Sequence, residues 1–558
     1  MKNKLIYWLL IFILIIGGCC RFYKLGSAPK GLYSDEAAIG YNAYSVLLTG
    51  KDEFGYKLPL LFRSFATFQA PIYTYITVPF VKFLGLSVFS TRLPSAIFGF
   101  LTIIMFFFLI RSISPKEIRN EIALISTLVL AISPWHIIFS RTAYETNVAL
   151  FFLVFGLLLF FKSLKVPMLL PISSVLFSVS ILAYAAERIM VPLLILLLVS
   201  KNWKFYKDNL NKYLLPAILS VIIGFILLYP TLLIVRTPGF LARVNVLNIF
   251  SYQRQMPAGF ISNYQGWLSK VVNFKPLLTL KEWSSLYLSY FSPRYLFSLG
   301  DSGPRSPYSD LSTFYIWQFP FYLYGLYKII REKKLGDLKF MTIVLLLVSP
   351  IAASMTREPY STIRALAMVV PQSVIIGLGI FSIFNKGIKR NLKYLGILIL
   401  SLGSMAKLYS SIMVQSEYFK ANYWEYGIED TLNVLDKLDN RYPIVWDNNR
   451  GNVYIQILFF KKFNPESYQK TNFEVNGGEY YSNMSRNVSK KIGDIEIREI
   501  VWGDDTDHVE KYLVGDALSI SDVQIREHGL IKIQDINYPD GNLAYRIVKT
   551  NPNLLFSD

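Results

Sequence analysis

The sequence predicts an α-helical membrane protein that crosses the bilayer many times and carries a soluble α/β or α+β domain at its C-terminal end. Composition is the first of three observations behind this fold class. Of the 558 residues, 53% are hydrophobic and only 17% are charged, and the mean hydropathy is +0.37. Soluble globular proteins are less apolar and more charged than this.

The second observation is the length of the apolar runs, since crossing a bilayer takes about 17 to 25 residues. Eleven runs approach or reach that length, at 5–20, 92–111, 120–139, 146–163, 168–186, 188–200, 213–235, 312–330, 340–356, 364–385 and 391–412. A further candidate at 69–86 is interrupted by prolines and Lys82. We expect an interfacial or half-inserted helix there, and about 11 to 13 transmembrane helices in all.

Basic clusters in the short loops predict the orientation, because Lys and Arg favour the cytoplasmic side. With 69–86 not crossing, the clusters Arg111/Lys116/Arg119, Lys162/Lys165, Lys201/Lys204/Lys207, Arg331/Lys333/Lys334/Lys339 and Lys386/Lys389/Arg390/Lys393 all lie inside. We therefore expect a membrane domain at 1–412 of a plasma-membrane protein. Its first extracytoplasmic loop with juxtamembrane helices spans 21–91, and a long extracytoplasmic loop spans 236–311.

The third observation is an acidic tail at 413–558, which we expect to be a separate extracytoplasmic domain. It holds 16 Lys and Arg against 23 Asp and Glu, a balance of −7 that leaves +26 on the membrane portion. Strand-like runs alternate with turn-rich stretches. The expected strands are 442–446, 452–460, 495–502, 531–536 and 543–548, after a helix at 425–439.

An acidic pair, Asp35 and Glu36, follows the first span inside the run GLYSDEAAIGYNAY. Carboxylates at a membrane boundary are costly to keep near lipid and are typical of functional sites. We interpret the pair as the start of an active site.

The residue inventory argues against metal and nucleotide chemistry. The chain has three histidines, His136, His508 and His528, and no HExxH, CxxC, P-loop or dinucleotide glycine motif. We therefore expect no metal and no cofactor. Cys19 and Cys20 give no disulfide framework. The run IIGGC resembles a lipoprotein cleavage site, but an uncleaved anchor is favoured because cleavage would release the loop that follows.

The long loop at 236–311 has an excess of positive charge. Its basic residues are Arg236, Arg243, Arg254, Lys270, Lys275, Lys281, Arg294 and Arg305, against Glu282, Asp301 and Asp310. Such cations can anchor an interfacial helix to anionic head groups, or they can hold a lipid phosphate through arginine forks. The sequence leaves both interpretations open.

Several segments in this order resemble the polyprenyl-phosphate-sugar glycosyltransferases of the GT-C fold, including protein O-mannosyltransferases and lipid A aminoarabinose transferases. The segments are GLYSDEA, Ala70 to Gly99, SPWHIIFSRTAYET at 133–146 and YFSPRYLFSLGD at 290–301. The resemblance covers about residues 1 to 412. It implies a catalytic acid in the first outer loop, at Asp35 with Glu36 beside it, and another in the next outer loop, at Glu145.

Two departures from the family pattern matter. Relatives often have His or Lys just before the proline that opens the segment after the first loop, where this chain reads Phe68-Gln69-Ala70-Pro71. The second acid is Glu145 and not the more usual Asp. This chain therefore lacks the charged side chain that would make a phosphate or acceptor contact before Pro71, whereas the charge at Glu145 is kept.

The resemblance implies a sugar donor linked by one phosphate to a polyprenol, an acceptor hydroxyl on a protein, lipid or glycan, and inversion at the anomeric carbon. We expect Asp35 to act as general base and preorganised cations to stabilise the leaving phosphate. The candidate phosphate-binding residues are Arg63, Arg92, Arg188, Arg294, Arg305 and Arg364. Glu187 orients Arg188 or forms a structural ion pair with it.

Two rivals come from other classes. A transporter or lipid flippase would also have many spans with charged residues, but here the charges cluster at the outer boundary and the two halves show no repeat. A surface sensor or assembly subunit would bind its partner through the acidic tail. Detection of sugar transfer from a polyprenyl-phosphate donor would distinguish an enzyme from a transporter and from a sensor or assembly subunit.

Overall fold

The computed structural model describes residues 3–65, 67–241, 249, 274–301, 303, 309–384, 390–448, 452–471, 479–482, 490–507 and 509–551. They fall into two compact units. The first unit, here the membrane unit, comprises residues 1–20, 98–140 and 145–405. The second, here the loop–tail unit, comprises residues 21–97, 141–144 and 406–558. The tail therefore shares a unit with the first loop, a division that differs from the domain boundary predicted at 412.

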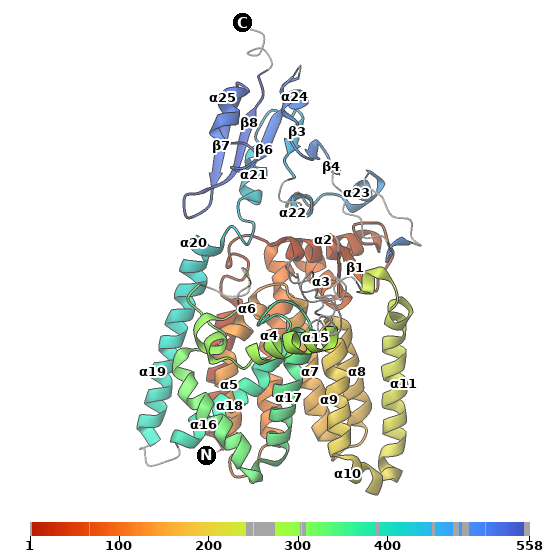
Figure 1. Ribbon diagram of the computed structural model, residues 1–558, viewed down its shortest axis with the longest axis vertical. Coiled ribbons are helices and arrows are strands. Elements are labelled where there is room, and N and C mark those ends of the chain that lie inside the picture. Colours follow the sequence, from red (N-terminus) through yellow and green to blue (C-terminus); the bar gives the residue numbers. More distant parts are fainter. Residues whose placement is uncertain are drawn as a thin grey trace, which may run out of the picture. The chain divides into compact units, whose positions relative to one another are not determined.

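The membrane unit is helical (Figure 1). Its α-helices are α1 (Asn3–Phe22), α5 (Arg119–Ile132), α6 (Pro134–Arg141), α7 (Glu145–Ser163), α8 (Leu169–Ala183), α9 (Glu187–Lys201), α10 (Trp203–Asp208), α11 (Leu210–Ile234), α15 (Lys275–Ser289), α16 (Phe319–Arg331), α17 (Gly336–Ser354), α18 (Val369–Phe384) and α19 (Arg390–Tyr409), together with most of α4 (Val88–Ile113). Short helical turns are η2 (Tyr295–Leu299), η3 (Ile316–Gln318), η4 (Lys333–Leu335) and η5 (Leu366–Met368).

A helix lies in each of the eleven segments predicted to cross the membrane. Within the described ranges, seven helices are long and apolar enough to cross, or eight if the bent pair α5 and α6, at 55° to each other, is one span. The shorter helix α8 is apolar as well. The chain is thus a multi-pass membrane protein. The 69–86 segment forms α3 (Pro71–Leu84), which has 14 residues and an internal Pro79.

Small residues and hydroxyls let these helices pack closely, as is usual in membranes. Helix α8 lies beside α7, α9 and α11 (Figure 1), and Ser173 donates to the carbonyl of Gly156 in α7 at 2.8 Å. Helices α16 and α18 cross at two glycines. A Cβ at Gly325 would lie 1.9 Å from Ile375 O, and one at Gly379 would lie 1.8 Å from Phe321 O. Neither position has room for a side chain.

The loop–tail unit contains two sheets and several short helices. Its helices are α2 (Ser34–Thr49), α3, the π-helical turn η6 (Ser410–Gln415), α20 (Ser416–Lys420), α21 (Ile428–Leu435), α22 (Val453–Phe460), α23 (Pro465–Thr471), α24 (Trp502–Asp505) and α25 (Asp522–Glu527). Its strands are β1 (Phe62–Ser64), β2 (Thr67–Gln69), β3 (Ile444–Trp446), β4 (Lys490–Ile492), β5 (Ile495–Ile497), β6 (Tyr512–Gly515), β7 (Ile531–Asn537) and β8 (Leu543–Lys549).

Six of these strands form one mixed sheet in the order β4-β5-β3-β6-β8-β7. The central strand β3 is parallel to β5 and β6, and the outer pairs are antiparallel. The turn between β7 and β8 has Gly541 at φ 91°, which suits glycine. The prediction of a C-terminal region with both helices and strands is confirmed, including four of the five predicted strand segments.

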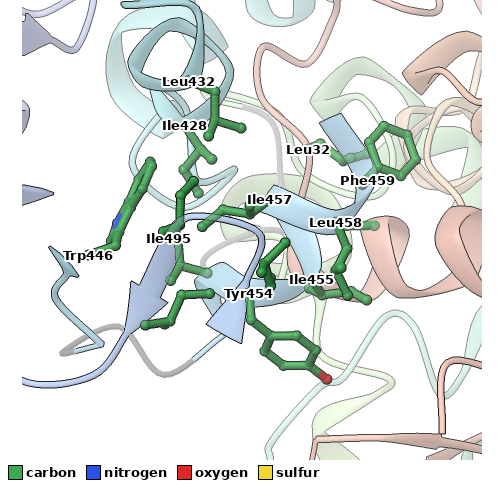
Figure 2. Packing of buried hydrophobic residues seen from close by; sticks show 14 of the residues in the cluster. Leu32, Ile428, Leu432, Trp446, Tyr454, Ile455, Ile457, Leu458, Phe459 and Ile495 are labelled. Carbon is green, nitrogen blue, oxygen red and sulfur yellow. The ribbon is translucent and has the colours of Figure 1, made fainter. Parts of the chain in front are cut away.

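The fifth predicted strand, at 452–460, is wrong, because α22 occupies it. Residues from Val453 to Phe459 are all buried, so α22 is buried on every side. Figure 2 shows its side chains between the sheet residues Trp446 and Ile495 and the first-loop residue Leu32. A fully buried apolar run of this length does not reveal its period, which explains the error.

Candidate active site

The acidic pair lies in the first turn of α2. The chain reaches this turn through Gly31, whose φ is 92°, and a Cβ there would meet Trp424 O at 2.3 Å. The backbone N–H of Tyr33, just before the helix, donates to Glu36 Oε2 at 3.4 Å. This is the usual way in which an acidic side chain satisfies a free N–H at a helix start.

The two neighbouring acids have different surroundings. Glu36 is 1% exposed and pairs with Arg92 of α4: its Oε1 accepts from Nε at 2.9 Å and its Oε2 from Nη2 at 2.8 Å. Oε1 also accepts the backbone N–H of Ala143 at 2.8 Å. Together with Tyr33, these contacts fill both oxygens of the carboxylate.

Arg92 is completely buried and fully engaged. Besides Glu36, its guanidinium donates to the carbonyls of Leu25 at 3.5 Å, Pro29 at 2.9 Å and Gly31 at 2.8 Å. A guanidinium has five N–H groups, and these contacts use all five. Arg92 therefore has no N–H left for a substrate phosphate, and we assign it to holding the loop that leads into α2.

A second buried arginine, Arg141, holds the same loop from another side. It is 0% exposed, and it donates to the carbonyls of Arg21, Lys24 and Ala28 at 3.5, 3.3 and 2.9 Å. The stretch from Arg141 to Ala143 thus braces both the loop and Glu36. Together Arg92 and Arg141 fix the backbone on which Asp35 stands.

Residues of the tail complete this support. Ser34 donates to Glu425 Oε1 at 3.2 Å, and the other oxygen of Glu425 accepts from Gln456 of α22. A Cβ at Gly40 would lie 2.5 Å from the Phe459 ring. The start of α2 is therefore packed against residues from the far end of the sequence.

Asp35, by contrast, is half-buried between buried Ser34 and buried Glu36. A carboxylate in the first turn of a helix is stabilised by the helix dipole. Asp35 is thus the acid of the pair that keeps partial access to its surroundings.

A second acidic pair, Asp52 and Glu53, follows α2 and is buried. Asp52 accepts from the Tyr480 hydroxyl at 2.6 Å and from the N–H of Tyr56 at 2.8 Å. Burial raises the pKa of Asp52 to about 6, against the effect of these hydrogen bonds. Burial likewise raises the pKa of Glu53 to about 7, although the positive charge of Lys490 acts in the opposite direction.

In the membrane unit, Glu145 opens α7 and is 7% exposed. Its neighbour Thr146 donates to Ile363 O at 3.0 Å, which ties the start of α7 to the residue before Arg364. Arg364 Nη1 donates to Thr356 Oγ1 at 3.1 Å and to Glu358 Oε2 at 2.5 Å. The Arg364 side chain is 18% exposed and that of Glu358 is 56% exposed, so this ion pair is open on one side.

The other predicted phosphate-binding arginines are far apart in the sequence and differ in burial and in neighbouring residues. Arg63 of β1 is 3% exposed and its guanidinium lies 5.1 Å from the Phe54 ring. Arg188 is half-buried with its guanidinium 4.3 Å from the Phe240 ring. Arg294 is exposed just before η2. Arg305 lies outside the described residues.

No protein-family model and no curated protein matches the chain. Among solved structures, ArnT from Cupriavidus metallidurans bound to undecaprenyl phosphate matches 99% of both chains with a TM-score of 0.51 and 11% identity. The apo state of that ArnT matches with a TM-score of 0.43. The archaeal oligosaccharyltransferase AglB from Archaeoglobus fulgidus matches with a TM-score of 0.49 and 12% identity, and the chain covers 61% of its length.

The lipid-bound ArnT match has a TM-score above 0.5 over nearly the whole of both chains. This chain has the GT-C glycosyltransferase fold. At this identity the likeness concerns the fold, and the activity is a separate question. The GT-C architecture expected from the sequence is confirmed.

Within this GT-C fold, several buried polar residues were not singled out from the sequence. Arg141, Asp301 and Thr362 all make buried hydrogen bonds in the described chain. Arg141 and Asp301 do lie inside the stretches that carry the family resemblance, and an arginine in an apolar stretch is itself a signal. Across the described residues, no group of three or more His, Cys, Asp or Glu side chains is placed to hold a metal ion.

Proposed function

We propose that this GT-C protein is a membrane glycosyltransferase that moves a sugar from a polyprenyl-phosphate donor to an acceptor hydroxyl on a protein, lipid or glycan. The fold supports this class of reaction, and the ArnT of the structural match is bound to undecaprenyl phosphate. We propose further that the reaction takes place on the extracytoplasmic side of the membrane. The distribution of Lys and Arg in the short loops supports that side.

The observation that carries the proposal is the division of labour between Asp35 and Glu36. Glu36 cannot accept a substrate proton without giving up a bond to Arg92, Ala143 or Tyr33. Asp35 is half-buried on the turn that these bonds hold in place. A general base needs a fixed position together with access to the acceptor, and the held turn and the partial exposure of Asp35 support this role for it.

In the proposed step, the acceptor oxygen attacks the anomeric carbon of the donor sugar. Its O–H bond breaks and the proton passes to the Asp35 carboxylate. The bond between the anomeric carbon and the phosphate oxygen breaks on the opposite face, so the configuration inverts. The electron pair leaves with polyprenyl phosphate, whose added negative charge a preorganised cation stabilises.

Arg364 is our proposed cation, and Glu145 is the proposed second acid. Arg364 retains partial exposure, and within the described residues its hydrogen bonds involve Nη1 alone. Its other nitrogens leave a fork that matches a phosphate. Arg63, Arg188 and Arg294 are secondary candidates, whereas the engagement of Arg92 removes it from the set.

The test is sugar transfer by the purified full-length protein from a defined polyprenyl-phosphate sugar. Asp35→Asn keeps the shape and removes the proton acceptor, so transfer should fall by about 10² to 10⁴-fold with donor binding retained. Asp430→Asn is the matched control, since Asp430 is an exposed acid in the first turn of α21. Near-wild-type turnover of Asp35→Asn would remove it from the mechanism.

Orientation has its own test in a background in which Cys19 and Cys20 are replaced by Ser. A cysteine in place of Leu518, which is 83% exposed, should react with an impermeant reagent added to intact cells. A cysteine at exposed Lys334, between α16 and α17, should react only after the membrane is opened. The reverse pattern would sink the extracytoplasmic mechanism.

A further inference from the structure

The segment from Tyr360 to Arg364, between α17 and η5, is irregular backbone held in one shape. Tyr360 has φ 53°, in the left-handed region that a bulky residue rarely adopts. It is fully buried, its ring stacks on Tyr295 at 5.0 Å, and its hydroxyl lies 2.9 Å from Thr313 Oγ1. Such strain persists where the surroundings determine the conformation, and it is common at functional sites.

Buried side chains from three other parts of the membrane unit hold the next three residues. The N–H of Ser361 donates to the Tyr290 hydroxyl at 3.0 Å. The carbonyl of Thr362 accepts from Trp135 Nε1 at 3.1 Å. The carbonyl of Ile363 accepts from Thr146, as described above. The backbone just before Arg364 is therefore fixed residue by residue.

Asp301 supplies the charged group among the side chains that hold residues 361–363. Its Oδ2 accepts from both the N–H and the hydroxyl of Thr362, at 2.7 and 2.6 Å. Its Oδ1 accepts the N–H of Gly303 at 2.7 Å. The side chain is 9% exposed. Hydrogen bonds to a charged group in such surroundings are stronger than neutral ones, so Asp301 is the strongest single constraint on Thr362.

Arg364 directly follows residues 361–363, and its side chain has partial access to solvent. Fixing residues 361–363 consequently fixes the direction in which Arg364 leaves the backbone.

We propose that Asp301 is a positioning residue which, through Thr362, orients Arg364 toward the phosphate of a lipid-linked donor. This rests on the proposed function, in which Arg364 stabilises the leaving phosphate. Asp301 itself touches no substrate. It acts because a carboxylate accepts three hydrogen bonds here, whereas an amide would turn an NH₂ group toward an N–H donor.

The test uses the purified full-length protein in lipid nanodiscs and three variants: Asp301→Asn, Arg364→Ala and the double variant. Arg364→Ala should raise the KM for the donor about 10- to 100-fold, as expected for the loss of a charged hydrogen bond to phosphate. Asp301→Asn should raise it in the same direction. The double variant should be no worse than Arg364→Ala, because Asp301 acts through that residue.

Asp310→Asn is the matched control. Asp310 is an exposed aspartate in the same loop with φ 57°, a conformation that asparagine tolerates. Its donor KM should stay at the wild-type value. If the effects of Asp301→Asn and Arg364→Ala multiply, or if Asp301→Asn leaves the donor KM unchanged, the positioning role is overturned.

Two further measurements keep the outcome clear. If Asp301→Asn does not fold, Thr362→Val, which removes only the 2.6 Å hydroxyl bond, should raise the donor KM by a smaller factor, and an unchanged KM overturns the inference. Binding of polyprenyl phosphate without sugar separates the two proposals. Binding that depends on Arg364 and Asp301 without any sugar transfer supports this inference and rejects the glycosyltransferase.

Discussion

Two arginine–glutamate pairs, one in each compact unit, have the same chemistry and opposite accessibility. In the loop–tail unit, the side chains of Arg92 and Glu36 are 0% and 2% exposed. In the membrane unit, those of Arg364 and Glu358 are 18% and 56% exposed. The first pair is sealed and uses every guanidinium N–H, whereas the second engages a single nitrogen. The sequence does not distinguish the two arginines as phosphate ligands. The structure does, because within the residues it describes Arg364 still has N–H groups available for a phosphate and Arg92 has none.

The largest effect should come from breaking the sealed pair. Arg92→Met leaves Glu36 buried without its counter-charge, which should lower the free energy of unfolding by about 3 to 5 kcal/mol. Thermal unfolding in detergent is the measurement. Arg441→Met is the control, because Arg441 pairs with Asp439 and its side chain is 78% exposed, and such surface pairs contribute little to stability. Equal melting of both variants would show that the Glu36 pair is not structural.

Replacing the open arginine should affect donor use and leave stability nearly unchanged. Arg364→Lys keeps the charge but not the fork, so its donor KM should lie between those of wild type and Arg364→Ala. Arg357→Ala, an exposed arginine in the same loop, serves as the control. If Arg364→Ala does not change the donor KM, the phosphate-binding role must be assigned to one of the other cations.

Glu53 is buried like Glu36 but has no arginine partner among the described residues, and it should make the loop–tail unit sensitive to pH. Its pKa is raised from 4.5 to about 7, so the folded state holds the proton more tightly than the unfolded state. Stability should fall as pH rises from about 4.5 to about 7, by on the order of 1 to 3 kcal/mol. Asp52, with its pKa raised to about 6, contributes with the same sign.

Hydrogen exchange of residues 34–57 at pH 5 and pH 8 measures this effect. Exchange should be faster at pH 8 after correction for the intrinsic rate, and Glu53→Gln should reduce the difference. Asp505 does not interfere, since its pKa is lowered to about 2 and its contribution is lost only below this window. Equal protection at both pH values would mean that Glu53 does not titrate in this range.

The smallest effect should come from the acidic member of the open pair. Glu358→Gln removes an exposed carboxylate that shares Arg364 Nη1, so stability should change by less than about 1 kcal/mol. Donor KM should stay the same or fall a few-fold, because phosphate no longer competes with Glu358. A large rise in donor KM would place Glu358 in the site and end the contrast with the sealed pair.

Periodicity and hydropathy identified the membrane helices, because spans of this length have few alternatives in a bilayer. The same signals failed at α22. Burial on all sides removes the periodic pattern that would distinguish a helix from a strand. The short strands β4 and β6 also escaped notice, since three or four residues carry little pattern. The place of β6 in the sheet is set by β3 and β8, which are distant from it in the sequence, whereas β4 pairs only with β5, which follows it closely.

The candidate site was predictable in part. The position of the acid pair followed from the sequence, but the difference between Asp35 and Glu36 did not, because it depends on Arg92 and Ala143. Adjacent residues in a helix point in different directions, and nothing in the sequence says which direction meets the buried arginine. Asp301 escaped for a similar reason, since its partner Thr362 lies 61 residues later in the chain.

The hydrogen bond from Ser34 to Glu425 joins residues that are 391 positions apart in the sequence. This separation determines when the bond can form during synthesis. A ribosome adding about 5 to 20 residues per second needs roughly 20 to 80 s to cover it. During that interval the helix that carries Asp35 lacks Trp424, Glu425 and Phe459, against which its first turns pack. The proposed general base therefore gains these supporting contacts only after residue 459 has been made, and we expect a chain that ends before this point to be inactive.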